Sequence, residues 1–212
     1  MRKRPYILPS IILIGIAVSA VCVGQRDRFL NVGRNGVPEW TVEEEFKHDV
    51  FTFVRIKYNS HVSWRRWATD YPDSDLNFSY RLQQLTSLKV NPDGKILELT
   101  DPSLFDYPFI YMIEPGALNF TEDEITGLKR YLQNGGFMMV DDFWGEAEYD
   151  NFYHEIKRVF PDREPVELPI DHPIFHCVYD LKEKPQVPSI GVAQWGRGQG
   201  ITWEREDAKE VH

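Results

Sequence analysis

Two adjacent carboxylates, Asp141 and Asp142, are the strongest candidates for functional groups in this sequence. They follow the apolar residues 137–140, a short run that is typical of a buried strand. In α/β proteins, ligands bind at the carboxyl ends of parallel strands, where a carboxylate can accept a hydroxyl proton, act as a general base or coordinate a metal. Neighbouring strand residues point to opposite faces. In regular strand geometry only one of the two would therefore face a site. We expect Asp142 to be catalytic and Asp141 to bind ligand; turn formation and helix capping are the alternative.

A second candidate is the pair Asp171 and His172, which directly precedes Pro173. Proline restricts the residue before it to extended conformations, and histidine exchanges protons near neutral pH. We expect His172 to be catalytic and Asp171 to bind ligand; a tight turn with a hydrogen-bonded histidine is the alternative. In an extended segment, His176 would share a face with His172, and both could join the acidic pair in a divalent-metal site. The spacing does not require a metal, and we predict no metal and no cofactor.

Arg55 and Tyr58 are the third candidate group. They lie in the β-rich segment 51–58, where Arg55 shares a face with two phenylalanines. At the carboxyl edge of a sheet, Arg55 could pair with the acidic residues or grip an anionic ligand. The alternative is an arginine that extends from the end of a strand to solvent.

Charge and missing motifs exclude several functions. The net charge is −9, which makes a nucleic-acid partner unfavourable because phosphate binding needs clusters of Lys and Arg. The chain contains no G-x-S-x-G elbow, P-loop, G-x-G-x-x-G or C-x-x-C motif. Its two cysteines, Cys22 and Cys177, are not expected to form a disulfide, and we predict that Cys177 is an inert buried thiol.

The N-terminus has the pattern of an export signal. Arg2, Lys3 and Arg4 precede the apolar residues 11–23, and a cut after Ala20 would suit the small residues there. We predict a signal peptide or anchor at 1–24 and a linker at 25–48, followed by an α/β domain at 49–212. The protein would then be exported to the periplasm or another extracytoplasmic site, and residues 6–24 would provide its only membrane contact if they are retained.

Strands and helices alternate through the domain, which predicts an α/β three-layer sandwich with a mainly parallel, flavodoxin-like sheet. The predicted strands are 51–58, 96–99, 108–113, 137–141 and 166–168, and another could begin at 201–204. The first predicted helix is capped by Asp73 or Ser74 and runs to about Leu88, and two more begin at 122 and 146. Thr121 and Glu124 form a capping box before the second helix, and Gly135 suits its left-handed end.

Several ordered motifs resemble the bacterial family called domain of unknown function 4159. They are residues 53–58, 101–108, 135–137 with the acidic pair, 158–162 and 171–175. The resemblance covers about residues 49–212. It implies a fold similar to class I glutamine amidotransferases, but no established activity, and the cysteine nucleophile of those enzymes has no counterpart here. Family members usually continue beyond the point that matches His212, so the resemblance implies that the domain lacks its C-terminal part.

These observations predict an exported domain that binds, and could hydrolyse, a carbohydrate or other cell-envelope ligand. In that hypothesis Asp142 accepts hydroxyl protons, Arg55 orients the ligand and His172 exchanges protons. The segment around residues 172–174 also resembles trehalose-utilisation-type domains, which favours a carbohydrate. The alternatives are a non-catalytic interaction domain with a protein partner in an envelope assembly, and a divalent-metal hydrolase.

Overall fold

The computed structural model describes residues 33–62, 65–184 and 188–200. The chain divides into two compact units, Met1–Trp40 and Thr41–His212, and the second contains the sheet. The predicted export signal and the predicted strand at 201–204 lie outside the described residues. In the part of the chain that is described, none of the helices has the length and apolar character needed to cross a bilayer.

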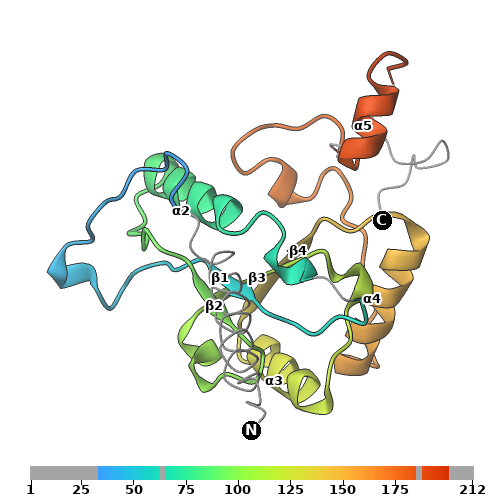
Figure 1. Cartoon of the computed structure of the whole chain (residues 1–212), viewed down its shortest axis with the longest axis horizontal. Coiled ribbons are helices and arrows are strands. Elements are labelled where there is room, and N and C mark those ends of the chain that lie inside the picture. The colour runs from blue at the N-terminus through green and yellow to red at the C-terminus, as the bar shows by residue number, and fades with distance from the viewer. Residues whose placement is uncertain (1–32, 63–64, 185–187, 201–212) are drawn as a thin grey trace, which may run out of the picture. The chain divides into compact units, whose positions relative to one another are not determined.

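Four parallel strands form a single sheet in the order β2-β1-β3-β4 (Figure 1). They are β1 (Val54–Ile56), β2 (Lys95–Leu97), β3 (Phe109–Ile113) and β4 (Phe137–Asp141). The register of β3 and β4 runs from Phe109↔Phe137 to Ile113↔Asp141, so their carboxyl ends are level. The predicted α/β fold with a parallel sheet is thereby confirmed, and the strand order agrees with the flavodoxin-like arrangement.

Three helices fall close to their predicted positions. They are α2 (Asp73–Leu85), α3 (Glu122–Gln133) and α4 (Gly145–Val159). The short α5 (Ile190–Gly196) was not predicted. The 3₁₀ turns are η1 (Glu44–Phe46), η2 (Arg66–Ala68), η3 (Pro102–Asp106), η4 (Pro115–Ala117) and η5 (Pro173–Phe175). The predicted capping box of α3 is confirmed, because Thr121 and Glu124 each accept the other's backbone N–H.

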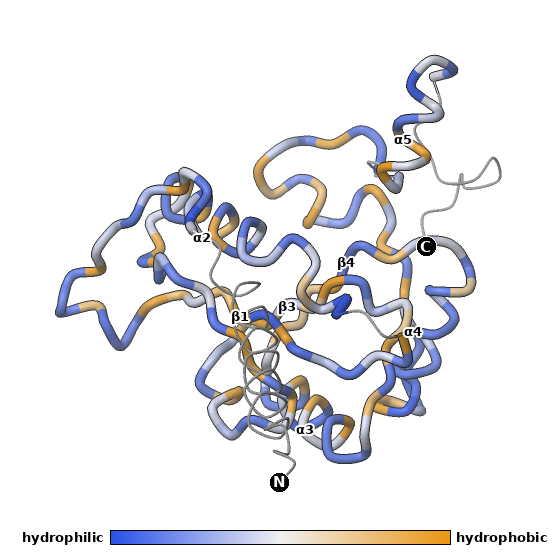
Figure 2. Tube along the Cα trace, in the orientation of Figure 1, coloured by the Kyte–Doolittle hydropathy of each residue, from blue (hydrophilic) through white to orange (hydrophobic). Residues whose placement is uncertain are grey.

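Helices cover both faces of the sheet. On one face, Val54 and Ile56 belong to an apolar cluster with Leu128 of α3 and Val159 of α4. On the other face, the Phe78 ring of α2 lies 5.1 Å from the Phe53 ring, centroid to centroid. Figure 2 shows hydrophobic residues recurring between hydrophilic ones along α3, as expected for a helix with one buried side. The domain is therefore a three-layer sandwich.

Two local predictions were wrong, and one open alternative is decided. Residues 166–168 form no strand, since Pro165 and Pro169 flank the segment and proline cannot donate to a strand ladder. Helix α2 has Pro72 as its N-cap residue, with no side-chain cap, and Asp73 is its first helical residue. Of the two alternatives for the segment after His172, the structure shows the turn: it is the 3₁₀ turn η5, because Pro173 at its first position is preorganised for a helical turn.

Candidate functional site

Tyr58 and Arg66 connect the carboxyl ends of the central strands. The strand order reverses direction between β1 and β3, which is where α/β sheets of this type commonly bind ligands. The buried Tyr58 hydroxyl lies 2.8 Å from the Ile113 carbonyl oxygen and 2.6 Å from that of Glu114, and donates its proton to this pair. Arg66 Nη2 donates to Glu148 Oε1 at 2.6 Å, and its Nε lies 3.4 Å from Glu114 Oε2. The crevice expected beyond β1 and β3 is therefore bridged by protein side chains.

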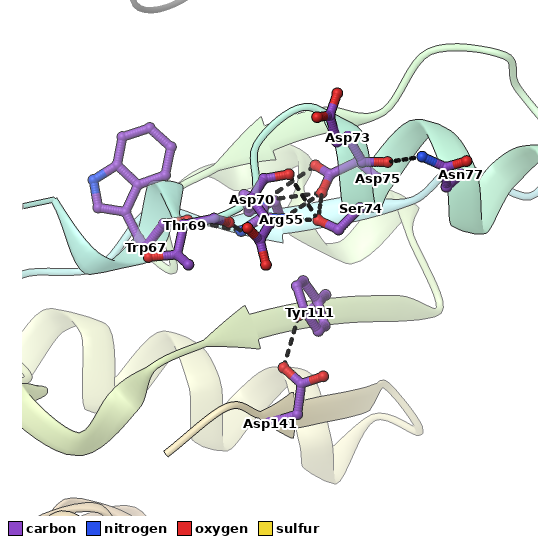
Figure 3. Close-up of polar contacts among 10 residues, drawn as sticks. All are labelled: Arg55, Trp67, Thr69, Asp70, Asp73, Ser74, Asp75, Asn77, Tyr111 and Asp141. Carbon is purple, nitrogen blue, oxygen red and sulfur yellow. Dashed lines mark hydrogen bonds and ion pairs between the residues drawn. The ribbon is translucent and has the colours of Figure 1, made fainter. Parts of the chain in front are cut away.

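Asp141 ends β4 and is held by Tyr111 of β3. The Tyr111 hydroxyl donates to Asp141 Oδ1 at 2.7 Å, across two strands that are paired in register (Figure 3). Burial raises the pKa of Asp141, the Tyr111 hydrogen bond opposes that rise, and the negative charge of Asp142 adds to it. Asp141 Oδ2 makes no hydrogen bond among the described residues. It is therefore a half-buried acceptor at the sheet edge.

Asp142 begins the loop between β4 and α4. Its backbone is left-handed, with φ 58°, and its Oδ1 accepts a hydrogen bond from Trp144 Nε1 at 3.0 Å. Trp144 is itself the N-cap residue of α4, and its backbone N–H donates to Glu148 Oε2 at 3.0 Å. Asp142 Oδ2 has no hydrogen-bond partner within the described part of the chain. The half-buried Asp142 thus presents one oxygen beside a half-buried indole ring.

Arg55 lies on the face of β1 that α2 covers, and it is fully buried. Its guanidinium forms an ion pair with Asp75 and also donates to Ser74 Oγ at 2.6 Å (Figure 3). It donates in addition to the carbonyl oxygens of Trp67 and Thr69, at 3.0 and 3.1 Å. All five guanidinium N–H groups are therefore used inside the protein, and none is left to grip a ligand.

The Arg55 guanidinium also links this buried cluster to the sheet edge. Its Cζ lies 5.1 Å from the centroid of the Tyr111 ring, within the range of a cation–π contact. Tyr111 in turn donates to Asp141. Tyr111 therefore lies between Arg55 and Asp141 and contacts both, and Arg55 does not pair directly with Asp141.

The carboxyl edge of the sheet carries more negative than positive charge. The carboxylates gathered there are Asp70, Glu114, Asp141, Asp142 and Glu148. The positive charge of Arg55 is balanced by Asp75, and Arg66 forms ion pairs with Glu114 and Glu148. Burial raises the pKa of Glu114, and the charges of Asp142 and Glu148 add to that rise, while Thr69 and Arg66 oppose it. The edge is therefore unfavourable for an anionic ligand.

Three of these acidic residues have a strained backbone. Asp70, Glu114 and Asp142 have φ values of 55°, 47° and 58°, in the left-handed region that is uncommon for residues other than glycine. Such conformations cost on the order of 1–3 kcal/mol each and are often found at functional sites. All three lie in loops beside the carboxyl ends of the strands, and the strain is therefore concentrated at the candidate site.

Asp171 and His172 are held by a different part of the chain. His172 Nδ1 accepts the Ile174 N–H at 3.3 Å and caps η5, which is the turn role considered as the alternative. Among the described residues, neither makes a hydrogen bond to Asp141 or Asp142. The described residues also contain no group of three or more His, Cys, Asp or Glu side chains that could hold a metal ion.

Cys177 corrects a further prediction. It is exposed rather than buried, and its thiol donates to the Ile174 carbonyl oxygen at 3.3 Å. The residues around it form a loop outside the sheet, and the apolar side chains of Val178 and Tyr179 are 79% and 77% exposed. The apolar composition of this segment suggested burial, but the loop does not pack into the core.

Sequence reasoning missed several members of the site, and Glu114, Asp75 and Arg66 show why. Glu114 directly follows β3, as Asp142 directly follows β4, so the rule that selected the acidic pair also applies to Glu114. Asp75 lies in the first turn of α2, where an acidic residue is ordinary and gives no signal of a buried ion pair. Arg66 lies in the loop after β1, and no pattern in the sequence connects it with Glu148, 82 residues away.

The fold and this edge define an α/β domain with a parallel sheet and an acidic, hydrogen-bonded carboxyl edge. The family model described as a domain of unknown function, DUF4159, matches residues 52–212. The chain therefore belongs to this family. A comparison with curated proteins found no match.

Proposed function

We propose that this domain binds a neutral, polyhydroxylated ligand, a carbohydrate of the cell envelope, at the carboxyl edge of its sheet. Asp142 is the principal acceptor of ligand hydroxyl groups, and Asp141 is a second. The observation that carries the proposal is the hydrogen bonding of the two Asp142 carboxylate oxygens. Its carboxylate is fixed by the Trp144 indole through one oxygen, while the other has no partner among the described residues.

Carboxylate and indole groups together are suited to a sugar. A carboxylate oxygen accepts the hydroxyl protons of a sugar, and an indole ring offers an apolar face to its C–H groups. Because Trp144 Nε1 is bonded to Asp142, the ring and the carboxylate are held in one fixed relation. Preorganised groups lose little conformational entropy on binding, which favours affinity.

The charge of the edge supports a neutral ligand over an anionic one. Carboxylates outnumber cations there, and Arg55 has no donor left for an anionic group. Hydrolysis needs a second group that can deliver a proton. The raised pKa of Asp141 makes it more suitable for that role than a solvent-exposed carboxyl group. His172 serves this role only if its loop approaches the edge.

Export from the cytoplasm is part of the same proposal. The basic and apolar residues at the N-terminus support it, and a cell-envelope ligand is accessible only to an exported protein. The anionic domain is a poor partner for nucleic acid, so binding to a glycan or to an envelope protein is the more favourable interaction.

Thermal-shift measurements on the full chain test the proposal, with a panel of neutral oligosaccharides that includes β-linked N-acetylglucosamine oligomers. A ligand at a hundred times its Kd stabilises the folded state by about 2.7 kcal/mol, which raises Tm by several degrees in a protein of this size. We expect at least one oligosaccharide to do so, and Asp142→Asn to abolish the shift. Asp150→Asn, at an exposed position of α4, is the matched control. A panel without effect, or a full shift in Asp142→Asn, would contradict the proposal.

An interaction domain in an envelope assembly is the second candidate function. It is favoured by β4, an edge strand of the described sheet that leaves Phe137 60% and Met139 37% exposed. Exposed apolar side chains on an edge strand are suited to binding another protein. A photo-crosslinking residue at position 137 would distinguish the two functions in cells. One recurring crosslinked partner, unchanged by Asp142→Asn, would favour the interaction domain.

A further inference from the structure

We infer that residues 170–181 form a pH-dependent latch, which is closed when His176 carries two ring protons and opens when it loses one. The latch is independent of the proposed ligand, because all of its groups lie within this loop. The latch does, however, include Asp171 and His172. Whether it is closed or open therefore decides where the side chains of those two residues lie.

The geometry of His176 requires the doubly protonated ring. Nδ1 lies 2.6 Å from Asp180 Oδ1, and Nε2 lies 2.8 Å from the carbonyl oxygen of Ile170. A backbone carbonyl oxygen only accepts hydrogen bonds, and an ionised carboxylate likewise has no proton to donate. Both ring nitrogens must therefore donate, which only the imidazolium form can do. Neutral histidine would leave one nitrogen lone pair facing an oxygen lone pair.

The two hydrogen bonds close the loop across η5. Ile170 precedes this turn and Asp180 follows it, so His176 joins the two ends of the segment. The Leu181 N–H also donates to the Phe175 carbonyl oxygen, at 3.1 Å, and this bond closes the same loop. Few other restraints hold the loop, because most of its side chains are exposed and contribute little packing. Loss of one His176 hydrogen bond therefore removes one of only a few restraints.

The charges around His176 favour its protonated form. Its hydrogen bond to Asp180 contributes most to raising the pKa of His176, followed by the bond to the Ile170 carbonyl and the negative charge of Asp171. Burial opposes this rise. Lys182 forms an ion pair with the other oxygen of Asp180. The same hydrogen bonds from Lys182 and His176 lower the pKa of Asp180, so its carboxylate stays ionised where the histidine is charged.

The sign of the pH dependence follows from the raised pKa. The latch is fully closed below the value of about 6.5 that histidine has in an unfolded chain. It weakens as the pH rises from there through the higher pKa of His176 in the closed loop. Within this window the closing equilibrium falls by up to about tenfold per pH unit, since closing requires one bound proton. His176 is largely exposed, so solvent limits the total effect.

Two measurements on the full chain test the latch. The ring resonances of the six histidines are titrated by NMR, with His176 assigned from the peak that His176→Gln removes. Hydrogen exchange then follows the peptide that contains Leu181 from about pH 5.5 to about pH 8.5, with each rate divided by the intrinsic rate at that pH. His154→Gln, at an exposed position of α4, is the matched control.

We expect His176 to titrate above the value of about 6.5 that histidine has in an unfolded chain, and the protection of Leu181 to fall with the same midpoint. In His176→Gln the protection should be low and independent of pH, while His154→Gln should behave as the wild type. Asp180→Asn should move the midpoint to lower pH. A normal titration of His176 would overturn the inference. So would protection that does not change with pH, or a pH dependence that persists in His176→Gln.

Discussion

The replacement Arg55→Met separates a structural role of Arg55 from a role in ligand binding. The side chain is fully buried, and its five N–H groups are bonded to Asp75, Ser74 and the carbonyl oxygens of Trp67 and Thr69. Methionine is similar in length but has no donor. The replacement therefore leaves a buried carboxylate without its ion-pair partner and removes the bonds to two carbonyls.

The expected cost of Arg55→Met is large. Removal of one partner from a buried ion pair costs about 3–5 kcal/mol, against a total stability of about 5–15 kcal/mol for a typical domain. Urea unfolding, followed by tryptophan fluorescence and far-UV circular dichroism, measures the loss. Asp75→Asn leaves the buried guanidinium without its counter-ion and should also cost about 3–5 kcal/mol. The double variant should cost less than the sum of the two, because the second replacement removes the charge that the first left unpaired.

The control for Arg55→Met is Arg81→Met, at an exposed arginine of α2 that bonds to Gln84. It should change stability by no more than about 0.5 kcal/mol. If Arg55→Met does not fold, Arg55→Lys keeps the charge with three donors and should show an intermediate loss. A cost below about 1 kcal/mol for Arg55→Met would refute the reasoning. The guanidinium would then not be committed to the protein interior, and a role in binding an anionic ligand would be the better explanation.

Three further predictions concern the sheet edge and α3. Tyr111→Phe should raise the pKa of Asp141 further, measured by carboxyl ¹³C NMR, because the hydroxyl that opposes the rise is lost. Gly127→Ala should destabilise the domain by about 1–3 kcal/mol or more in urea unfolding, because the new Cβ would lie 2.2 Å from the Leu99 carbonyl oxygen. Thr121→Ala should cost about 1 kcal/mol in the same assay, because it removes the side-chain cap of α3.

Positions outside these contacts provide the controls for these three. Thr126→Ala, on the exposed side of α3, should leave stability almost unchanged or raise it slightly. Tyr153→Phe removes an exposed hydroxyl that bonds to Glu164 and should not affect the titration of Asp141. A Gly127→Ala variant as stable as Thr126→Ala would contradict the close approach of α3 to the Leu99 backbone. An unchanged Asp141 titration in Tyr111→Phe would contradict the hydrogen bond between them.

The acidic residues of the edge add a pH prediction of their own. Because the pKa values of Asp141 and Glu114 are raised in the folded state, that state binds more protons than the unfolded chain near these values. Their contribution to stability therefore grows as the pH falls through the raised values, and is least favourable at neutral pH. In Asp141→Asn the unfolding free energy should gain less on acidification than in the wild type, as measured by urea unfolding at several pH values. An equal gain in both proteins would show that Asp141 titrates normally.

Local patterns predicted most of the secondary structure. The capping box at Thr121 and the glycine at 135 are short-range signals, and α3 begins and ends where they indicate. The apolar run before Asp141 is long enough to define β4 and to place both carboxylates at its end. The same kind of reasoning failed at 166–168, where a β-prone composition without a neighbouring strand did not form a strand. A strand needs a partner, and the identity of that partner is not a local property.

The sequence by itself determined the alternation of strands and helices, the parallel sheet and the edge at which the acidic residues lie, because these depend on periodicity, capping and chain direction. Only the tertiary structure decided what those residues contact. Arg55 was expected to reach Asp141 or a ligand, yet it pairs with Asp75, which a helix brings across the face of the sheet. His172 caps its own turn, and His176 binds both ends of its loop. The physical reason is that hydrogen bonds and ion pairs depend on distances of a few ångströms between groups far apart in sequence, and only packing sets those distances.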